Sequence, residues 1–511
     1  MHTKIYSATI IGIETYLVDV EVDISYGLLN FFIVGLPDAA IKESRQRVVT
    51  ALKNSSIKLP EKKITVNLAP ADLKKEGTLF DLPIAMGILV ASQIVQVDAQ
   101  FLEETLFLGE LSLDGTIKPI KGILPVAYDA RTFGKKRLII PKENAQEAAL
   151  IKQVEVIGVS NLVELIGFLR KEIILSPEKS CIEDFDTATD EHKIDFSQVK
   201  GQPMAKRALQ IAAAGKHNIL FVGSPGSGKT MLASRLPTIM PPMSFDEILE
   251  TSKIYSVSGK IHNNPFIFKR PFRNPHHTIS SVGLVGGGSS AQPGEISLAH
   301  NGVLFLDEMT EFKKDCLEIL RQPLEERSIL ISRAHYSVKF PAAFLLVAAL
   351  NPCPCGFALD KKRQCICQPN QVTKYLSKLS GPFLDRIDLQ VSVGSINYDN
   401  IIETKINEIS SAELYSKIKI AVDTQKARNN NAFNAYLPID KIGSICVLTD
   451  GAQAIMKQAF EKLHLTMRGY HKLLKVSRTI ADLESSDLIM EEHVKEALMY
   501  RFLDQIVEKK S

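Results

Sequence analysis

A lysine and a threonine close a glycine-rich stretch that directly follows an apolar run. The run is NILFV and the stretch is GSPGSGKT. Glycines let backbone N–H groups wrap around an anion, a lysine ammonium neutralises terminal phosphates, and a threonine hydroxyl is a ligand for Mg²⁺. The pattern predicts a P-loop that binds ATP and Mg²⁺ through Gly223, Ser224, Pro225, Gly226, Ser227, Gly228, Lys229, Thr230 and Met231.

Two adjacent acidic residues, Asp307 and Glu308, follow a second apolar run, GVLFL. An aspartate at the end of a buried strand suits a Mg²⁺ site shared with Thr230, and a neighbouring glutamate suits a general base that polarises the attacking water. Because the pair follows a P-loop in the sequence, it predicts hydrolysis of ATP as well as binding. We expect Lys229, Asp307 and Glu308 to be catalytic.

Four of the seven cysteines lie in one short loop, NPCPCGFALDKKRQCICQP. The two side chains of a C-x-C pair face the same way in extended backbone, so two such pairs joined by a turn suit four thiolates around Zn²⁺. A redox-sensitive cluster and unliganded thiols are the alternatives. The candidate zinc ligands are Cys353, Cys355, Cys365 and Cys367.

The elements that must position these residues follow from hydrophobic patterning. NILFVG, GVLFLDE and AAFLLVAALNP are typical of buried strands, and longer helical or glycine-rich stretches separate them. This favours a parallel sheet in an α/β core. Strand-like and helical runs also alternate before the core, whereas only helical runs follow it. We expect an α/β domain at 1–170, a polar linker at 171–193, the P-loop core at 194–395 and a helical lid at 396–511.

Composition excludes several classes of protein. The chain has 511 residues with 45% hydrophobic and 23% charged residues, so it is expected to form several globular domains. No apolar run approaches the roughly 18 residues that span a bilayer, and the N-terminus does not resemble a signal peptide. We therefore expect a cytoplasmic protein without a membrane partner. A net charge of +3 means that any DNA binding must come from a local basic surface.

The order of four motifs, namely the P-loop, LFLDE, ALNP and GPFLDRIDL, resembles an AAA+ ATPase. The resemblance implies that Asn351 is the sensor-1 residue and that Arg386 is an arginine finger reaching a neighbouring subunit's ATP. A surface pair of Arg386 with Asp385 or Asp388 is the alternative. For the sensor-2 role in the lid, Arg468 is the first candidate and Arg478 the second.

A longer stretch, KRPFRNPHHTISSVGLVGGGSSAQPGEISLAHNGVLFLDE, is more specific. Together with RQPLEERSILISRAHYSVKFPA and NPCPCG, it resembles the magnesium-chelatase-like AAA+ ATPases of the ComM/YifB type, over essentially the whole chain. The resemblance implies that the glycine-rich loop and the hairpin SILISRAHYSVKF project into a ring's pore and grip DNA, with Arg333 and His335 at the hairpin tip. Alternatively, the hairpin packs on its own domain.

Two adjacent histidines, His276 and His277, also stand in the longer stretch. Their side chains should point apart, in a structural or nucleotide-proximal turn rather than a metal site.

The N-terminal domain resembles the protease domain of Lon, which has the ribosomal S5 domain 2-like fold. Lon-type catalysis needs a serine and a lysine. In KEGTLFDLPIA, Leu79 stands where the serine should fall, and in PIKGILPVA, Leu124 replaces the lysine. Thr78 and Lys121 lie nearby in a different register. We expect this fold without proteolysis.

Several lysines of the N-terminal domain lie close together in the sequence. They suggest a DNA-binding or ring-stabilising surface, or simply a solvated face: Lys58, Lys62, Lys63, Lys74 and Lys75.

The family resemblance implies a homo-hexameric, ATP-driven DNA motor. It would be a helicase or branch-migration enzyme that acts on single-stranded or branched DNA and assists recombination of incoming DNA in natural transformation. Two alternatives remain open. One is a metal-chelatase motor subunit that drives Mg²⁺ insertion into a porphyrin, and the other is an ATP-dependent protease or chaperone.

Overall fold

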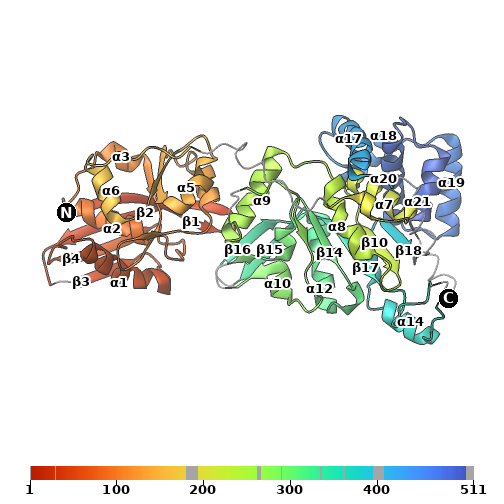
Figure 1. Cartoon of the computed structure of the whole chain (residues 1–511), viewed down its shortest axis with the longest axis horizontal. Helices are drawn as coiled ribbons and strands as arrows, with labels where there is room; N and C mark the ends of the chain where they lie inside the picture. The colour runs from red at the N-terminus through yellow and green to blue at the C-terminus, as the bar shows by residue number, and fades with distance from the viewer. Residues whose placement is uncertain are drawn as a thin grey trace.

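The chain forms three parts that lie in a row in the computed structural model: an N-terminal α/β domain, a central P-loop core and a group of C-terminal helices (Figure 1). The structure describes residues 2–28, 30–179, 194–261, 266–288, 291–333, 336–360, 363–394 and 408–501. Most of the expected linker, residues 180–193, lies outside the described residues. None of the described helices is long and apolar enough to cross a membrane.

The N-terminal domain is built on a mixed seven-stranded sheet with the order β3-β4-β2-β1-β5-β8-β9. In β2, buried Val18, Val20 and Val22 alternate with partly exposed acidic residues, because one face of the sheet packs against helices α1 and α2. An Asp114-Gly115 turn joins the antiparallel strands β6 and β7. The elements are β1 (His2–Ile11), β2 (Glu14–Ser25), β3 (Asn30–Val34), α1 (Ala39–Asn54), β4 (Lys63–Ala69), α2 (Asp81–Ala91), α3 (Ala99–Glu103), β5 (Thr105–Phe107), β6 (Glu110–Leu111), β7 (Ile117–Lys118), α4 (Ile123–Asp129), β8 (Arg137–Pro141), α5 (Lys142–Ala149), β9 (Glu155–Val159) and α6 (Leu162–Leu169).

The central core is a parallel five-stranded sheet with the order β11-β14-β17-β10-β18. Its middle strands are buried along their whole length, which explains their continuous apolar sequences. The elements are α7 (Pro203–Gly215), β10 (Ile219–Gly223), α8 (Lys229–Ile239), α9 (Phe245–Ser258), β11 (Phe272–Arg273), α10 (Ser281–Val285), β12 (Gly286–Gly287), β13 (Gln292–Pro293), α11 (Glu295–Leu298), β14 (Val303–Leu306), α12 (Lys314–Ile319), α13 (Arg321–Glu326), β15 (Ser328–Arg333), β16 (Tyr336–Pro341), β17 (Leu345–Leu350), α14 (Pro369–Leu376), α15 (Gly381–Leu384) and β18 (Leu389–Val393).

The C-terminal part is helical, as the sequence predicts. Helices α17 and α20 pack on α7 of the core and share one hydrophobic cluster with the P-loop sheet, so the lid is joined to the core by a continuous apolar interior. The elements are α17 (Ser411–Arg428), α18 (Ile439–Ile445), α19 (Asp450–Lys462), α20 (Met467–Leu483) and α21 (Glu491–Met499).

Helix α9 joins the N-terminal domain to the core (Figure 1). The helix starts with a capping box between Ser244 and Glu247 and ends at Gly259 in the left-handed conformation. Near its end, the Ser256 hydroxyl donates to a carboxylate oxygen of Glu147 at 2.5 Å, and the Gly122 N–H donates to the Ser256 carbonyl at 3.1 Å. The docking is therefore polar as well as apolar.

One lysine of the expected basic surface is not on the surface. Lys75 is fully buried, and its ammonium donates to the carbonyl oxygens of Gly35 and Pro70. Burial lowers its pKa. Lys58 and Lys63 are exposed, so the prediction of one solvated lysine face was wrong for Lys75, which sequence proximity alone had placed there.

The carboxyl group of Glu147 makes the docking of the N-terminal domain sensitive to pH. Burial raises its pKa to about 7 from the model-compound value of 4.5, against the hydrogen bonds from Ser256 and Asn144. Because the folded state holds this proton more tightly than the unfolded state, stability falls as pH rises from about 4.5 through about 7. Glu147→Gln mimics the protonated group, so we expect its melting temperature to exceed that of the wild type by an amount that grows from pH 5.5 to about pH 7 and then levels off.

The matched control for this prediction is Glu143→Gln, an exposed glutamate on the same helix. Its melting temperature should follow the wild-type pH profile in thermal unfolding. Parallel profiles for Glu147→Gln and the wild type would contradict the prediction.

Candidate nucleotide-binding site

The P-loop joins the carboxyl end of β10 to the first turn of α8. Gly226 and Gly228 have φ angles of 75° and 88°, which favour glycine. The Lys229 ammonium donates to the carbonyl oxygens of Gly223 at 2.7 Å and Ser224 at 2.9 Å, and to Asn351 Oδ1 at 3.2 Å. Burial lowers the pKa of Lys229, while Asp307 and Glu308 oppose this shift. The lysine is thus anchored beneath the loop, in contact with the expected sensor-1 residue.

Thr230 and Asp307 meet across the same edge of the sheet. Thr230 Oγ1 donates to Asp307 Oδ2 at 2.7 Å. A hydroxyl and a carboxylate held together are hard oxygen ligands of the kind that Mg²⁺ prefers. Glu308 follows at φ 50°, a left-handed conformation that turns its half-exposed side chain away from the strand.

A cavity of about 380 Å³ lies at this edge of the sheet. Inside the P-loop, the Ser227 hydroxyl is buried without a hydrogen-bond partner among the described residues. Gly223 and Ser224, also predicted to bind the nucleotide, do not line the cavity, and their carbonyl oxygens accept from Lys229. A loop of amides, a lysine, a spare hydroxyl and a pair of oxygen ligands fit a nucleoside triphosphate with Mg²⁺. The lining residues are Pro225, Gly226, Ser227, Gly228, Lys229, Thr230, Met231, Asp307, Glu308, Leu350 and Asn351.

His277 does not line the cavity but contacts Glu308, which does. Its Nδ1 lies 3.5 Å from Glu308 Oε2, and its ring lies 4.1 Å from the ring of His276, centroid to centroid. The chain turns here, as expected, with the Ile279 N–H donating to the His276 carbonyl. The expectation that the two histidines point apart was wrong, because this turn brings their rings together. The turn brings an imidazole against the proposed general base.

Arg386 and Arg468 do not line the nucleotide cavity of their own chain. Arg386 Nη2 lies 2.8 Å from Glu325 Oε1, and Arg468 pairs with the same oxygen. The alternative pairing of Arg386 with Asp385 or Asp388 is not what the structure shows: Asp388 faces His217 and Lys472 instead. The two arginines expected to sense ATP come together, away from the P-loop.

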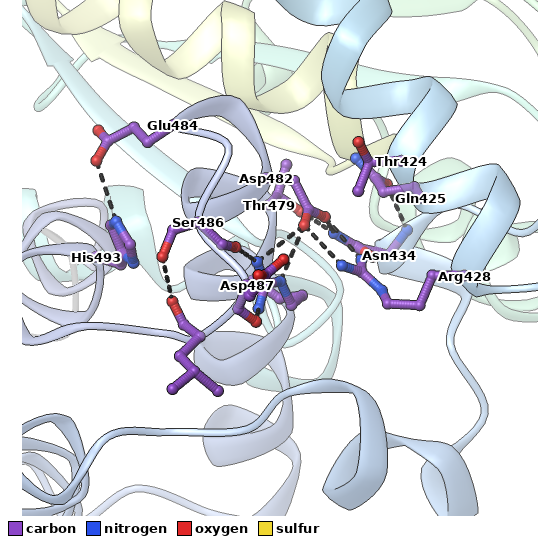
Figure 2. Close-up of polar contacts among 12 residues, drawn as sticks. Thr424, Gln425, Arg428, Asn434, Thr479, Asp482, Glu484, Ser486, Asp487 and His493 are labelled. Carbon is purple, nitrogen blue, oxygen red and sulfur yellow. Dashed lines mark hydrogen bonds and ion pairs between the residues drawn. The ribbon is translucent and has the colours of Figure 1, made fainter.

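Arg478, the second sensor-2 candidate, is part of the interior of the lid. Its side chain is 1% exposed, its Nε donates to Asp482 at 3.0 Å, and its Nη1 donates to the Asp487 carbonyl at 2.7 Å. Figure 2 shows the polar network around Asp482, to which Arg428 and Asn434 also donate. A guanidinium held in this way has a structural role.

The four clustered cysteines converge. Their sulfur atoms all lie within 4.8 Å of one another, with Cys353 and Cys355 3.3 Å apart. Backbone N–H groups of Phe357 and Ile366 lower the pKa of Cys355 to about 6. Between the two pairs, Gly356 packs against the P-loop, since a Cβ there would lie 2.5 Å from Pro225 Cδ. The cysteine loop therefore touches the nucleotide site directly.

The stem of the β15–β16 hairpin packs on the core of the protein. Ile329, Val338 and Phe340 are buried in the core, and Val338 also meets the Gly12 turn of the N-terminal domain. The backbone of Arg333 is described, but its side chain and the whole of His335 lie outside the described residues. The expected DNA contacts of these two residues stay a prediction.

Known proteins are similar in sequence to this chain over almost its full length. Family models described as "Magnesium chelatase, subunit ChlI", "Subunit ChlI of Mg-chelatase" and "Magnesium chelatase, subunit ChlI C-terminal" match residues 195–401, 20–144 and 408–501. Competence protein ComM of Haemophilus influenzae is 43% identical over 99% of both chains. Uncharacterized protein YifB of Escherichia coli is 40% identical over 98% of this chain and 97% of its own. The chain belongs to the ComM/YifB family.

As a member of the ComM/YifB family, the chain is a magnesium-chelatase-type AAA+ ATPase with a Lon-like N-terminal domain. Lon protease 2 of Bacillus subtilis is 32% identical over 139 residues, which are 27% of this chain and 23% of that protein. Leu79 and Leu124, which we expected in place of the Lon serine and lysine, are partly buried and fully buried. Thr78 donates to Glu110, and the Lys121 side chain lies against Gly259 of α9.

The two lid arginines of this ComM/YifB-family chain should respond differently to removal. Arg478→Ala leaves Asp482 buried with fewer donors, so we expect a loss of about 3–5 kcal/mol of unfolding free energy. Arg468→Ala removes a surface pair and should change stability by less than about 0.5 kcal/mol, yet lower ATPase activity. Urea unfolding and ATPase assays distinguish the two. A stable Arg478→Ala variant with impaired ATPase would reverse the assignment.

Proposed function

We propose that this protein is an ATP-hydrolysing DNA motor that works as a homo-hexameric ring. It would act as a helicase or branch-migration enzyme that assists recombination of incoming DNA in natural transformation. The observation that carries the ATPase half is the contact of Thr230 with Asp307 beside Lys229. The DNA half rests on the full-length relative named a competence protein and on the two inserts of the core, the glycine-rich loop and the β15–β16 hairpin.

The residues of the site suit hydrolysis of the terminal phosphate. Amides of the P-loop and the Lys229 ammonium hold the phosphates and balance their charge, while Thr230 and Asp307 would hold Mg²⁺. Bound Mg²⁺ would neutralise charge on the phosphate oxygens. Glu308 takes the proton of the attacking water, and Asn351, tied to Lys229, orients that water. Because Arg386 faces away from its own cavity, it would serve a neighbouring subunit, which is why a ring is proposed.

A structural Zn²⁺ in the cysteine loop is also part of the proposal. Four thiolates within 4.8 Å of one another fit a tetrahedral site, and thiolates are ligands that zinc favours. The packing of Gly356 on Pro225 suggests the purpose, because a clip at this point stiffens the connection between the P-loop and the segment that carries Arg386.

The motor function predicts an ATPase that DNA stimulates. We expect single-stranded or forked DNA to raise the wild-type ATPase rate severalfold, and forked DNA to be unwound. Lys229→Ala and Glu308→Gln should both lose unwinding and at least about 100-fold of kcat, since each removes charge stabilisation or the base. Glu308→Gln should still bind ATP, whereas Lys229→Ala should bind it poorly.

The wild type alone can refute the DNA motor. An ATPase rate that does not change with DNA, with no strand displacement, would do so. Stimulation by a porphyrin-bearing partner protein would favour the chelatase alternative, and ATP-dependent casein degradation would favour the protease alternative.

Zinc binding predicts a stoichiometric metal that depends on the cysteines. Protein expressed in metal-replete, reducing conditions should contain about one Zn²⁺ per chain by elemental analysis, and Cys353→Ser with Cys365→Ser should contain none. Cys316→Ser, which changes a buried cysteine far from the cluster in sequence, is the matched control and should keep the metal. Metal-free wild type would count against the site.

A further inference from the structure

One carboxylate, that of Glu325 on α13, receives two arginines from different parts of the chain. Arg386 follows α15 in the core and Arg468 lies at the start of α20 in the lid. Both guanidiniums reach Oε1 of Glu325, Arg386 at 2.8 Å. This convergence depends on the docking of the lid on the core, so it was not visible in the sequence.

The two arginines are held to different degrees. The Arg386 side chain is 9% exposed, and besides Glu325 it donates to the carbonyl oxygens of Arg321 and Pro382. The Arg468 side chain is 50% exposed, and in the described part of the chain Glu325 is the only partner of its guanidinium. Glu325 therefore orders Arg468 and completes the binding of Arg386.

The backbone around Arg386 is fixed from both sides. The Asn218 amide donates to the Arg386 carbonyl at 3.0 Å from the start of β10, and Lys472 of α20 donates to the Ile387 carbonyl at 3.1 Å. Lys472 also faces Asp388 at 3.4 Å. The same lid helix thus contacts the Arg386 segment once through Lys472 and again through Arg468 and Glu325.

Electrostatics explains why a carboxylate is needed here. Two guanidiniums that contact the same oxygen atom repel each other, and each long side chain loses rotamer freedom when it is ordered. The negative charge of the Glu325 carboxylate between them offsets the repulsion. It also holds both side chains in one rotamer before a ligand binds. The pair keeps further N–H donors, in the fork geometry that suits phosphate oxygens.

We propose that Glu325 is a positioning residue that sets Arg386 and Arg468 as one pair for the terminal phosphates of ATP bound in a neighbouring copy of this chain. The inference rests on the proposed ring motor and extends it, because it assigns both arginines to one site and names the group that aligns them. Glu325 itself does not touch the nucleotide.

The test is Glu325→Gln, with Glu326→Gln, an exposed neighbour on the same helix, as the matched control. We expect Glu325→Gln to lower kcat about tenfold, as loss of one charge-assisted contact would, with KM changed less than about twofold and an unchanged melting temperature. Glu325→Asp should restore part of the rate. On an Arg386→Ala, Arg468→Ala background, Glu325→Gln should have no further effect, because it acts through these two residues.

Mixed assemblies test the action on a neighbour. Lys229→Ala subunits have intact arginines, and Glu325→Gln subunits have an intact P-loop, so their mixture should exceed the summed activity of the separate variants. Mixing Lys229→Ala with Arg386→Ala should give the same gain.

Two results would overturn the inference: wild-type kcat in Glu325→Gln, or a loss of kcat that persists unchanged on the double-arginine background. Failure of the proposed motor is read separately, from wild-type protein that is not stimulated by DNA or does not assemble.

Discussion

The register of the parallel sheet is the constraint on which the site depends. Strand β17 pairs with β10 so that Leu350 faces Val222, and with β14 so that Ala348 faces Leu306. Gly223 at the end of β10, and Asp307 and Asn351 directly after β14 and β17, must then lie at one edge of the sheet. A slip of one residue would turn every side chain to the opposite face of the sheet and separate these groups. The contacts of Lys229 with Asn351 and of Thr230 with Asp307 are consequences of that register.

Two segments that contact the nucleotide site, the glycine-rich segment and the cysteine loop, are attached to the same strands. Arg273, at the end of β11, forms a two-point ion pair with Glu295, at distances of 2.6 and 2.7 Å, and so closes the base of the glycine-rich segment 274–294. The first turn of that segment carries His277 to Glu308. On another side of the P-loop, the cysteine loop rests on Pro225 through Gly356. Both segments therefore contact residues of the nucleotide site directly.

The opposite ends of the strands hold the Arg386 segment, which would face a neighbouring subunit in the proposed ring. Asn218 accepts from the Leu346 N–H at the start of β17 and donates to the carbonyl of Arg386, so the strand that leads to Asn351 and the segment of the arginine finger share one amide. The two edges of one rigid sheet would thus carry the site for a subunit's own ATP and the residues for its neighbour's.

Local sequence was sufficient for the P-loop, the acidic pair, the strands around them, the cysteine cluster and the helical lid. Each of these depends on spacing or periodicity over fewer than about 20 residues, where backbone geometry leaves few alternatives. Charged side chains with distant partners were harder. Lys75 was expected on a surface and is buried, Arg478 was a sensor candidate and belongs to the lid interior, and Glu325 was not singled out at all.

The sequence by itself determined which chemistry this chain carries, because a phosphate loop, a pair of carboxylates and four closely spaced thiols are defined by residue type and short spacing. Only the tertiary structure decided which arginines lie together and which are buried inside the lid. Arg386 and Arg468 are 82 positions apart, and they meet on Glu325 because the lid packs on the core through a shared apolar interior. No local pattern encodes a meeting that depends on how two domains dock.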